Sequence, residues 1–392
     1  MGPTSGSLQA VTIVLAIAAA AGTALLWNRI PGPRPARVLA RTALLVSGQL
    51  MASVAILVWL NIANGGLIVS WQDLLGDQSV RGGVFAGQHG NVVLNPVPVA
   101  ASVRYAPASA AASASARSAL RRFQPAENGF KVTTLHGAAS GITSQVFIWT
   151  PPQYTAEPNE RFPVLELLHG VWGSPEGWTG PMNVVAHLEA AEQSGSVHPY
   201  ILVVPEVTPI RGHTTPRDNE ECSNVPGGAM VDTWLTQDVR TMVLTDYRAE
   251  PSASGWGLMG YSTGGFCAAK LVLQHPDLYK AAVSLSGYYT PDSVLLQRDS
   301  DLDHADSPLW LVGHTRTPAV SLLMTASAQD HVDPPSECAQ MVAAARANPL
   351  SRATEIQSFT APLGGGHNQS AWEKMLPTAF DWLSLRLAGP AS

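Results

Sequence analysis

Charged side chains are scarce in this 392-residue sequence, of which they make up 13%. None occurs before Arg29, and none occurs between Arg41 and Asp73. The two uncharged parts, 8–27 and 42–62, are almost wholly apolar, and each is about 20 residues long, enough to cross the hydrocarbon core of a bilayer as a helix. A buried helix of a soluble protein is rarely apolar on all faces over such a length. We therefore expect two transmembrane helices.

Acidic residues are missing from the segment between the two apolar runs, whose charged side chains are all basic: Arg29, Arg34, Arg37 and Arg41. The positive-inside rule places such a segment in the cytoplasm. A cleaved signal peptide is the alternative for the first run, but this run lacks a basic start and a second run follows closely. We expect residues 1–63 to be a multi-pass anchor in the cell membrane, with the large C-terminal part on the extracytoplasmic side.

The rest of the chain has no excess of positive charge. Four of the 23 Lys and Arg residues lie in the first 41 positions, so the other 351 positions carry 19 basic and 29 acidic groups, a net charge of −10. This balance gives no reason to expect a nucleic-acid partner. The sequence also shows no metal-ligand cluster and no phosphate-binding loop, so we expect no metal and no cofactor.

Cysteine is rare, with only Cys222, Cys267 and Cys338 present. A disulfide is possible outside the cytoplasm, and an odd number of cysteines leaves at least one thiol free. Cys222 with Cys267 is the pairing we favour, and three unpaired thiols remain the alternative.

The pattern of the chain changes near residue 129. Residues 64–128 read as a juxtamembrane segment and an Ala/Ser-rich linker, whereas residues 129–392 alternate between apolar strand-like runs and helical periodicity. We expect strands at 130–135, 142–149, 163–168, 200–205, 256–259, 281–285, 320–326 and 355–360. We expect helices at 182–193, 233–247, 265–275, 335–347 and 370–387. The last helix should be kinked or restarted at Pro377. This order predicts an α/β domain with a mostly parallel central sheet, helices on both faces, and an antiparallel hairpin at its start.

The segment Gly260-Tyr261-Ser262-Thr263-Gly264 is the strongest functional signal. It lies between an expected strand and an expected helix, where a strained turn exposes a serine and needs small neighbours. Gly265 adds further room. An ordinary Gly-rich turn is the alternative for these five residues taken alone.

A serine hydroxyl needs a base, and the base needs an orienting acid, in the chain order serine, acid, histidine. His331 and His367 are the histidines late enough in the chain, and we favour His367, in a Gly-rich loop after the last strand, as the base. Asp330 is the first acid after the strand at 320–326 and is our candidate, with Asp333 as its rival.

Backbone amides should stabilise the oxyanion of the tetrahedral intermediate. Thr263, directly after the serine, and Val171, in the loop after the strand at 163–168, are our candidates, with Trp172 second to Val171. We expect His169 to support this loop. Trp172 and Trp178 are candidates for the walls of the substrate pocket, and packing of the loop is their alternative role.

Four motifs together resemble the esterase branch of the α/β-hydrolases that includes S-formylglutathione hydrolase and the mycolyltransferases. They are Leu167-Leu168-His169-Gly170, the serine motif with Gly265, Ser284-Leu285-Ser286-Gly287-Tyr288, and Gly365-Gly366-His367-Asn368 with Trp372 downstream. The resemblance covers about 129–387. It implies an α/β-hydrolase fold and ester chemistry through Ser262, an acid and His367.

The chain departs from the mycolyltransferases in two respects. They use a glutamate where this chain has Asp330, and they are exported by cleaved signals rather than held by two membrane spans. The anchored, Ala-rich pattern looks similar to actinobacterial esterases.

Three functions are consistent with these residues. The first is a membrane-anchored serine esterase that hydrolyses carboxylic esters of a small molecule or lipid through an acyl-enzyme. The second is an acyltransferase that moves the acyl group onto a sugar or lipid of the cell envelope, and the choice depends on water access and an acceptor pocket. The third is a non-catalytic binding domain, which the presence of all three residue types in order disfavours.

Overall fold

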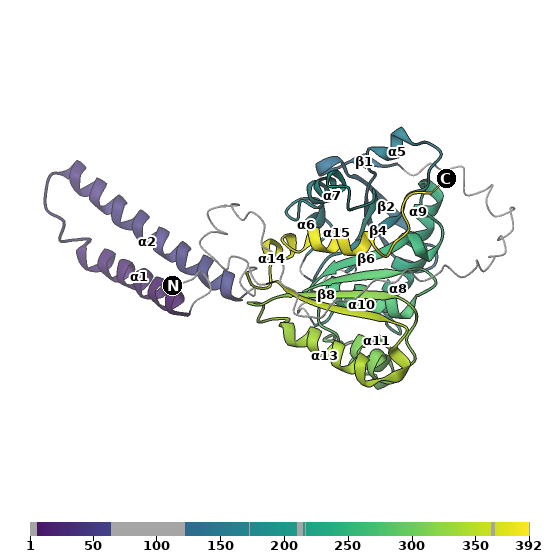
Figure 1. Cartoon of the computed structure of the whole chain (residues 1–392). Coiled ribbons are helices and arrows are strands. Elements are labelled where there is room, and N and C mark those ends of the chain that lie inside the picture. Colours follow the sequence, from purple (N-terminus) through teal and green to yellow (C-terminus); the bar gives the residue numbers. More distant parts are fainter. Residues whose placement is uncertain are drawn as a thin grey trace.

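The computed structural model describes residues 6–63, 122–171, 173–209, 215, 217–361 and 365–391. Two long N-terminal helices, α1 (Gly6–Leu26) and α2 (Arg34–Ala63), form a hairpin (Figure 1). Both are long and apolar enough to cross a membrane, over Leu8–Leu26 and Arg34–Trp59.

The second helix begins earlier than the sequence predicted, at Arg34 and not near residue 42. Proline in the first turn and the Ala, Leu and Arg residues after it favour the helical conformation, which explains the longer helix. Arg29 is therefore in the connection, whereas Arg34, Arg37 and Arg41 lie on α2.

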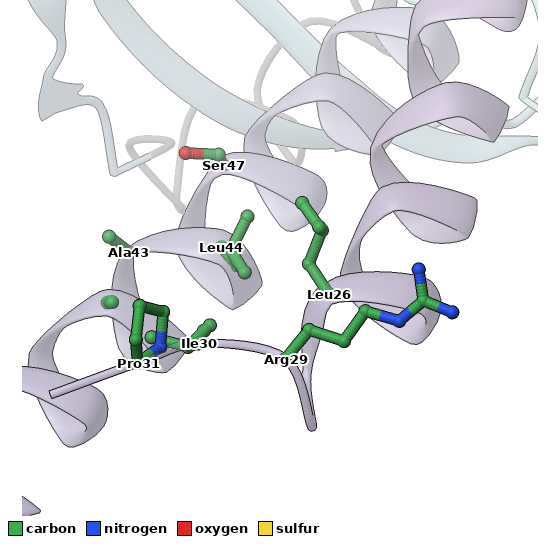
Figure 2. Close-up of a pocket in the computed structure, with 8 residues that line it drawn as sticks. Leu26, Arg29, Ile30, Pro31, Ala43, Leu44 and Ser47 are labelled. Atoms are coloured by element: carbon green, nitrogen blue, oxygen red, sulfur yellow. The ribbon is translucent and has the colours of Figure 1, made fainter.

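Contacts between side chain and backbone join the two helices at this turn. Arg41 donates from Nε to the Trp27 carbonyl over 3.0 Å and stacks on the Trp27 ring. Arg29 borders a hollow beside the turn, whose other lining residues are mostly apolar: Leu26, Ile30, Pro31, Ala40, Ala43, Leu44 and Ser47 (Figure 2).

The rest of the described chain is built on one nine-stranded sheet, in the order β1-β2-β3-β5-β4-β6-β7-β8-β9. The strands are β1 (Gln124–Pro125), β2 (Lys131–His136), β3 (Thr143–Trp149), β4 (Val164–Leu168), β5 (Ile201–Pro205), β6 (Trp256–Tyr261), β7 (Ala281–Leu285), β8 (Ser321–Ser327) and β9 (Glu355–Ala361). In this spatial order, the pairs from β5 to β9 are parallel, and the pairs from β1 to β5 are antiparallel. The mostly parallel sheet and its initial hairpin are confirmed.

Helices cover both faces of the sheet (Figure 1). Side chains from α8 (Val231–Thr233), α9 (Arg240–Asp246), α10 (Thr263–Gln274), α12 (Pro308–His314) and α13 (Pro335–Ala347) join the core on one face. Those from α6 (Glu176–Thr179), α7 (Val184–Gln193), α14 (Gln369–Glu373) and α15 (Leu376–Ser384) join the core on the other. Two further short helices are α5 (Gln153–Ala156) and α11 (Ser300–Asp306). The central strands are buried throughout, as expected for a parallel sheet covered on both sides.

Two boundaries differ from the sequence prediction. The sheet begins at Gln124, inside the segment 64–128 that the sequence predicts to be a juxtamembrane segment and an Ala/Ser-rich linker. Residues 64–121 of that segment lie outside the described residues. The helix expected at 233–247 starts at Val231 and contains a π-helical stretch, Trp234–Val239. The Trp234 indole in this stretch donates to the Glu206 carbonyl over 3.0 Å.

Parallel strands bring several loops to one edge of the sheet. The strands β4, β6, β7, β8 and β9 pair in parallel in that spatial order, so their carboxyl ends lie side by side. In open α/β sheets, ligands bind at this edge. Each of the four sequence motifs lies at or just after one of these strand ends.

Candidate active site

Ser262 follows β6 directly and has a positive φ of 55°, which a residue with a side chain rarely adopts. The turn leaves no space for side chains at its glycines. A Cβ at Gly260 would overlap the Gly264 carbonyl oxygen, and one at Gly264 would overlap the Leu168 carbonyl oxygen. The sharp turn at this serine therefore depends on both glycines of the motif.

His367 approaches the serine from the loop after β9. The Ser262 hydroxyl lies 2.8 Å from His367 Nε2, and His367 Nδ1 lies 3.0 Å from Asp330 Oδ2. This geometry fits the tautomer with hydrogen on Nδ1, so that Nε2 can accept the serine proton. The loop of His367 is attached to β8 because the Ser327 hydroxyl donates to the Gly365 carbonyl.

Asp330 is fixed more firmly than its rival Asp333. It is 1% exposed, and its Oδ1 accepts hydrogen bonds from the amides of Val332 and Asp333 over 3.0 and 2.9 Å. Burial alone would raise the pKa of Asp330, but the hydrogen bond and charge of His367, together with hydrogen bonds from the Asp333 amide and Ser286, hold this pKa below its ordinary value. Asp330 is therefore an ionised partner for the imidazole.

Asp333 also faces the imidazole, with its Oδ2 3.7 Å from His367 Nδ1. Burial is the main cause that raises the pKa of Asp333 to about 7. For His367, burial lowers the pKa, but the hydrogen bond to Asp330 and the charge of Asp333 raise it above its ordinary value overall. The histidine thus has two carboxyl groups near Nδ1, one in hydrogen-bonding contact and one more distant.

The two oxyanion candidates lie on segments that adjoin the serine. Thr263 is the first residue of α10, so its amide belongs to a helix N-terminus, where negative charge is favoured. The loop with Val171 passes close to Ser262, because a Cβ at Gly170 would lie 2.9 Å from Ser262 Cβ. Their role as oxyanion donors stays a prediction.

His169 is hydrogen-bonded to the loop that leads to Val171. It is fully buried, its Nδ1 lies 2.9 Å from the Gly170 carbonyl oxygen, and its Nε2 lies 2.7 Å from Glu206 Oε1. Burial would raise the pKa of Glu206, but His169 and Thr208 lower it to about 2. A carboxylate and a buried imidazole thus hold the loop beside the serine.

The tryptophans near the site have different positions. Trp178 is fully buried and packs against the Tyr261 ring, 5.2 Å away, which favours the packing role for this residue. Trp172 lies outside the described residues. Trp372 meets His367 edge to face at 5.1 Å and stacks on Tyr261, a contact that spacing in the sequence did not indicate.

The arrangement can perform nucleophilic chemistry on a carbonyl, because a strained serine contacts a histidine that contacts a buried carboxylate. Comparison with known proteins gives the class. The chain belongs to the esterase family described as "Putative esterase", whose family model matches residues 138–383. It is thus a member of a serine-hydrolase family with the α/β-hydrolase fold.

Individual relatives match much of the chain at low identity. An uncharacterized protein of Corynebacterium glutamicum is 23% identical over 300 residues, which cover 74% of this chain and 69% of the relative. Among solved structures, a ferulic acid esterase has a TM-score of 0.56 at 17% identity, covering 66% of this chain and 98% of that one. An S-formylglutathione hydrolase from Agrobacterium tumefaciens has a TM-score of 0.55 at 14% identity, covering 68% of this chain and 99% of that one. These structural similarities support the fold.

Proposed function

We propose that the protein is a membrane-anchored serine esterase, with Ser262 as nucleophile, His367 as general base and Asp330 as orienting acid. The observation that carries this proposal is the continuous line of contacts from the serine hydroxyl through the imidazole to the buried carboxylate. Membership of the esterase family supports it independently.

The first half of the reaction forms the acyl-enzyme. The oxygen of Ser262 bonds to the ester carbonyl carbon as its proton moves to His367 Nε2, and the amides of Val171 and Thr263 stabilise the oxyanion. The bond to the alcohol oxygen then breaks, and the alcohol takes the proton from the imidazole as it leaves. Asp330 stabilises the imidazolium in between without taking its proton.

Water completes the cycle in the second half. It gives a proton to His367 as it attacks the acyl carbon, and the bond to Ser262 breaks as the serine regains a proton. The products are a carboxylic acid and the free enzyme. An alcohol of a sugar or lipid in place of water would make the same acyl-enzyme a transferase.

The N-terminal hairpin supports the anchoring part of the proposal. Large apolar side chains on α1 and α2 are exposed, among them Val14, Ile17, Leu45 and Leu57. An apolar surface of this extent is better placed in lipid than in water. The arginines near the turn of the hairpin favour a cytoplasmic turn and an extracytoplasmic catalytic domain.

The test uses the full-length protein in detergent micelles with p-nitrophenyl acetate. We expect a burst of p-nitrophenol followed by steady turnover, and we expect Ser262→Ala to lower kcat by about 10⁴-fold or more. Ser252→Ala is the matched control, because Ser252 is exposed and precedes β6 at the opposite edge of the sheet. A burst without turnover would favour transfer, and sugar or lipid alcohols would then be supplied as acceptors. Equal rates in all three proteins would contradict the triad.

A further inference from the structure

A hydrogen-bonded tyrosine and glutamate lie beside the nucleophile. The Tyr288 hydroxyl donates to Glu221 Oε1 over 2.6 Å, and the hydroxyl oxygen lies 3.4 Å from Thr263 Oγ1. The Tyr288 ring stacks on Phe266, with centroids 4.9 Å apart and planes 18° apart. Tyr288 thus lies against the first turn of α10, which begins at the residue after Ser262.

The single proton of the phenol gives these contacts a direction. The shorter contact indicates that the phenol donates its proton in a hydrogen bond to the Glu221 carboxylate. The phenol oxygen can then accept a hydrogen bond from the Thr263 hydroxyl. Glu221 is itself 1% exposed, and its Oε1 also accepts from the Asp292 amide over 3.1 Å. The carboxylate therefore has a fixed position from which to orient the phenol.

The backbone at Glu221 is strained and is attached covalently to the nucleophile's helix. Glu221 and Cys222 have positive φ angles of 46° and 56°, an unfavourable conformation for residues with side chains. Cys222 forms a disulfide with Cys267 of α10, the pairing that the sequence favoured. Strained residues of this kind persist only where the surrounding structure holds them, and they concentrate at functional sites.

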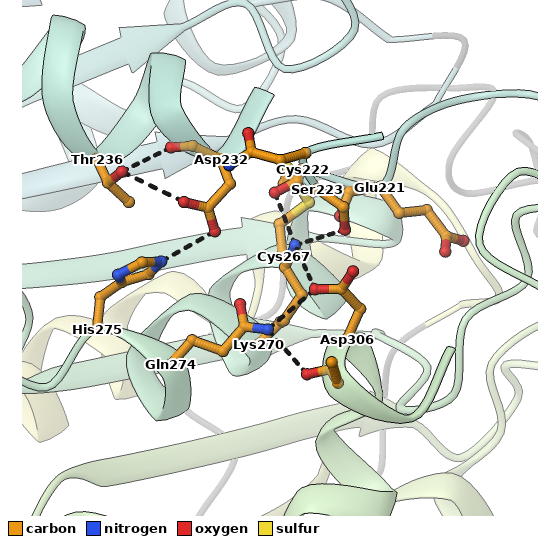
Figure 3. A network of polar contacts seen from close by, with 12 residues as sticks. Glu221, Cys222, Ser223, Asp232, Thr236, Cys267, Lys270, Gln274, His275 and Asp306 are labelled. Atoms are coloured by element: carbon orange, nitrogen blue, oxygen red, sulfur yellow. Dashed lines mark hydrogen bonds and ion pairs between the residues drawn. A yellow bond between two sulfur atoms is a disulfide. The ribbon is translucent and has the colours of Figure 1, made fainter. Parts of the chain in front are cut away.

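A buried lysine on the same helix reinforces the attachment (Figure 3). Lys270 is fully buried, and its Nζ donates to the Cys222 carbonyl and to the Ser223 hydroxyl, each over 2.7 Å. Asp306 balances its charge at 3.4 Å. Two independent links, one covalent and one through the lysine, therefore keep the Glu221 turn in register with the helix that follows the nucleophile.

We propose that Glu221 and Tyr288 are positioning residues of the esterase site, and that they act through Thr263. The fixed carboxylate orients the Tyr288 hydroxyl, and this hydroxyl holds the Thr263 side chain. The Thr263 amide is thereby kept aligned with the place where the oxyanion forms. The inference rests on the proposed esterase function, in which this amide is one of two oxyanion donors.

The test compares two tyrosines of the same domain in full-length protein in detergent. Tyr288→Phe removes the hydroxyl beside Thr263 and keeps the ring that stacks on Phe266. Tyr279→Phe is the matched control, because the Tyr279 hydroxyl also donates to a buried carboxylate, Glu166, over 2.8 Å, but near the opposite edge of the sheet. We expect Tyr288→Phe to lower kcat for p-nitrophenyl acetate about 10- to 100-fold with KM changed by less than about threefold. Tyr279→Phe should leave kcat within about twofold.

Glu221 provides a rescue experiment. Burial raises the pKa of Glu221 to about 7, so the assays are run at about pH 8, where its carboxylate is mostly ionised. Glu221→Ala removes the acceptor of the phenol proton and should match Tyr288→Phe in kcat. Glu221→Gln keeps an acceptor oxygen and should restore kcat to within about threefold of the wild type. Thermal unfolding of each variant shows whether a loss of activity merely follows a loss of folded protein.

The outcomes separate the inference from the function on which it rests. The positioning role would be overturned if Tyr288→Phe kept the wild-type kcat, or if Tyr279→Phe lost as much kcat at equal thermal stability. Either result would leave the proposed esterase function standing. A wild-type protein without Ser262-dependent turnover would overturn the esterase, and the positioning role with it.

Discussion

Two aspartates in one turn, Asp330 and Asp333, face the same imidazole with different consequences. Asp330 accepts the Nδ1 hydrogen and two backbone amides, whereas Asp333 stays 3.7 Å away and has its pKa raised to about 7, mainly by burial. A carboxylate orients a histidine by accepting its hydrogen, and a more distant one acts through its charge alone. The first is thus the orienting acid of the proposed mechanism, and the second tunes the basicity of His367.

The two roles predict different effects of removing each charge. Asp330→Asn should lower kcat by about 10⁴-fold, because an amide can hold the wrong tautomer of His367. Asp333→Asn should cost less than about tenfold, because the hydrogen bond to Asp330 remains. Steady-state kinetics with p-nitrophenyl acetate measure both losses.

The pH profile distinguishes the two aspartates further. The charge of Asp333 raises the pKa of His367, so its removal lowers that pKa. The base must be neutral to act, and the acid limb of kcat/KM should therefore move to lower pH in Asp333→Asn. A limb that moves to higher pH, or Asp333→Asn as inactive as Asp330→Asn, would contradict this division of roles.

The sequence predicts these site residues better than it predicts their surroundings. Three side chains that the structure brings into contact are predictable from local patterns. These patterns are the strand before Ser262, the small residues around this serine, and the chain order serine, acid, histidine. The contact of Tyr288 with Glu221 joins residues 67 positions apart through a strained turn, and no local pattern encodes it. The edge-to-face contact of Trp372 with His367 likewise exists only after the last helices pack on the sheet.

At the scale of elements, α10 adjoins Ser262 and is attached to the rest of the domain by two further links. Its N-terminus follows the nucleophile, and its middle is attached by the Cys222–Cys267 disulfide and by Lys270. The ends of the central strands were predictable within one or two residues because buried apolar runs are short and bounded by turns. The π-helical stretch Trp234–Val239 was not predictable from the sequence, because it accompanies a contact between Trp234 and Glu206, which are distant in the chain.

The disulfide should contribute measurable stability. It joins residues separated by 45 positions, and a loop of this size corresponds to about 4 kcal/mol in the chain-entropy description, with measured values usually about 2–4 kcal/mol. The double variant Cys222→Ala with Cys267→Ala should lose stability in this range when unfolded in urea. Cys338→Ala is the control, because Cys338 is buried but unpaired. Reducing agent should destabilise the wild type and the control, and an unchanged midpoint in both would count against the bridge.

At the scale of the whole molecule, the described chain combines an apolar hairpin with an α/β-hydrolase domain. The apolar runs predict the hairpin, but the second uncharged run begins only after Arg41, so the predicted start of the second helix is too late. Three arginines are instead part of α2. Long arginine side chains can extend along a helix to the membrane surface, so charge alone is a poor marker of a helix end.

Thiol labelling in intact cells tests the orientation of this architecture. In a Cys338→Ala background, Asn28→Cys places a thiol in the connection of the hairpin, and Thr241→Cys places one on the exposed side of α9. We expect a membrane-impermeant maleimide to label Thr241→Cys in intact cells, and to label Asn28→Cys only after the membrane is permeabilised. The reverse pattern would show the opposite orientation, and equal labelling of both would show that the hairpin does not span the membrane.

The unpaired Cys338 has a consequence for the production of this protein. Three thiols permit three single-bridge isomers, and only the one that joins Cys222 to Cys267 places Glu221 as described. The buried position of Cys338 protects the finished fold from exchange, but not the nascent chain. If the cysteines oxidise before the chain folds, the preparation will therefore contain isomers with the wrong disulfide and an identical mass. Titration of the reactive serine per mole of protein will measure the fraction with the correct disulfide.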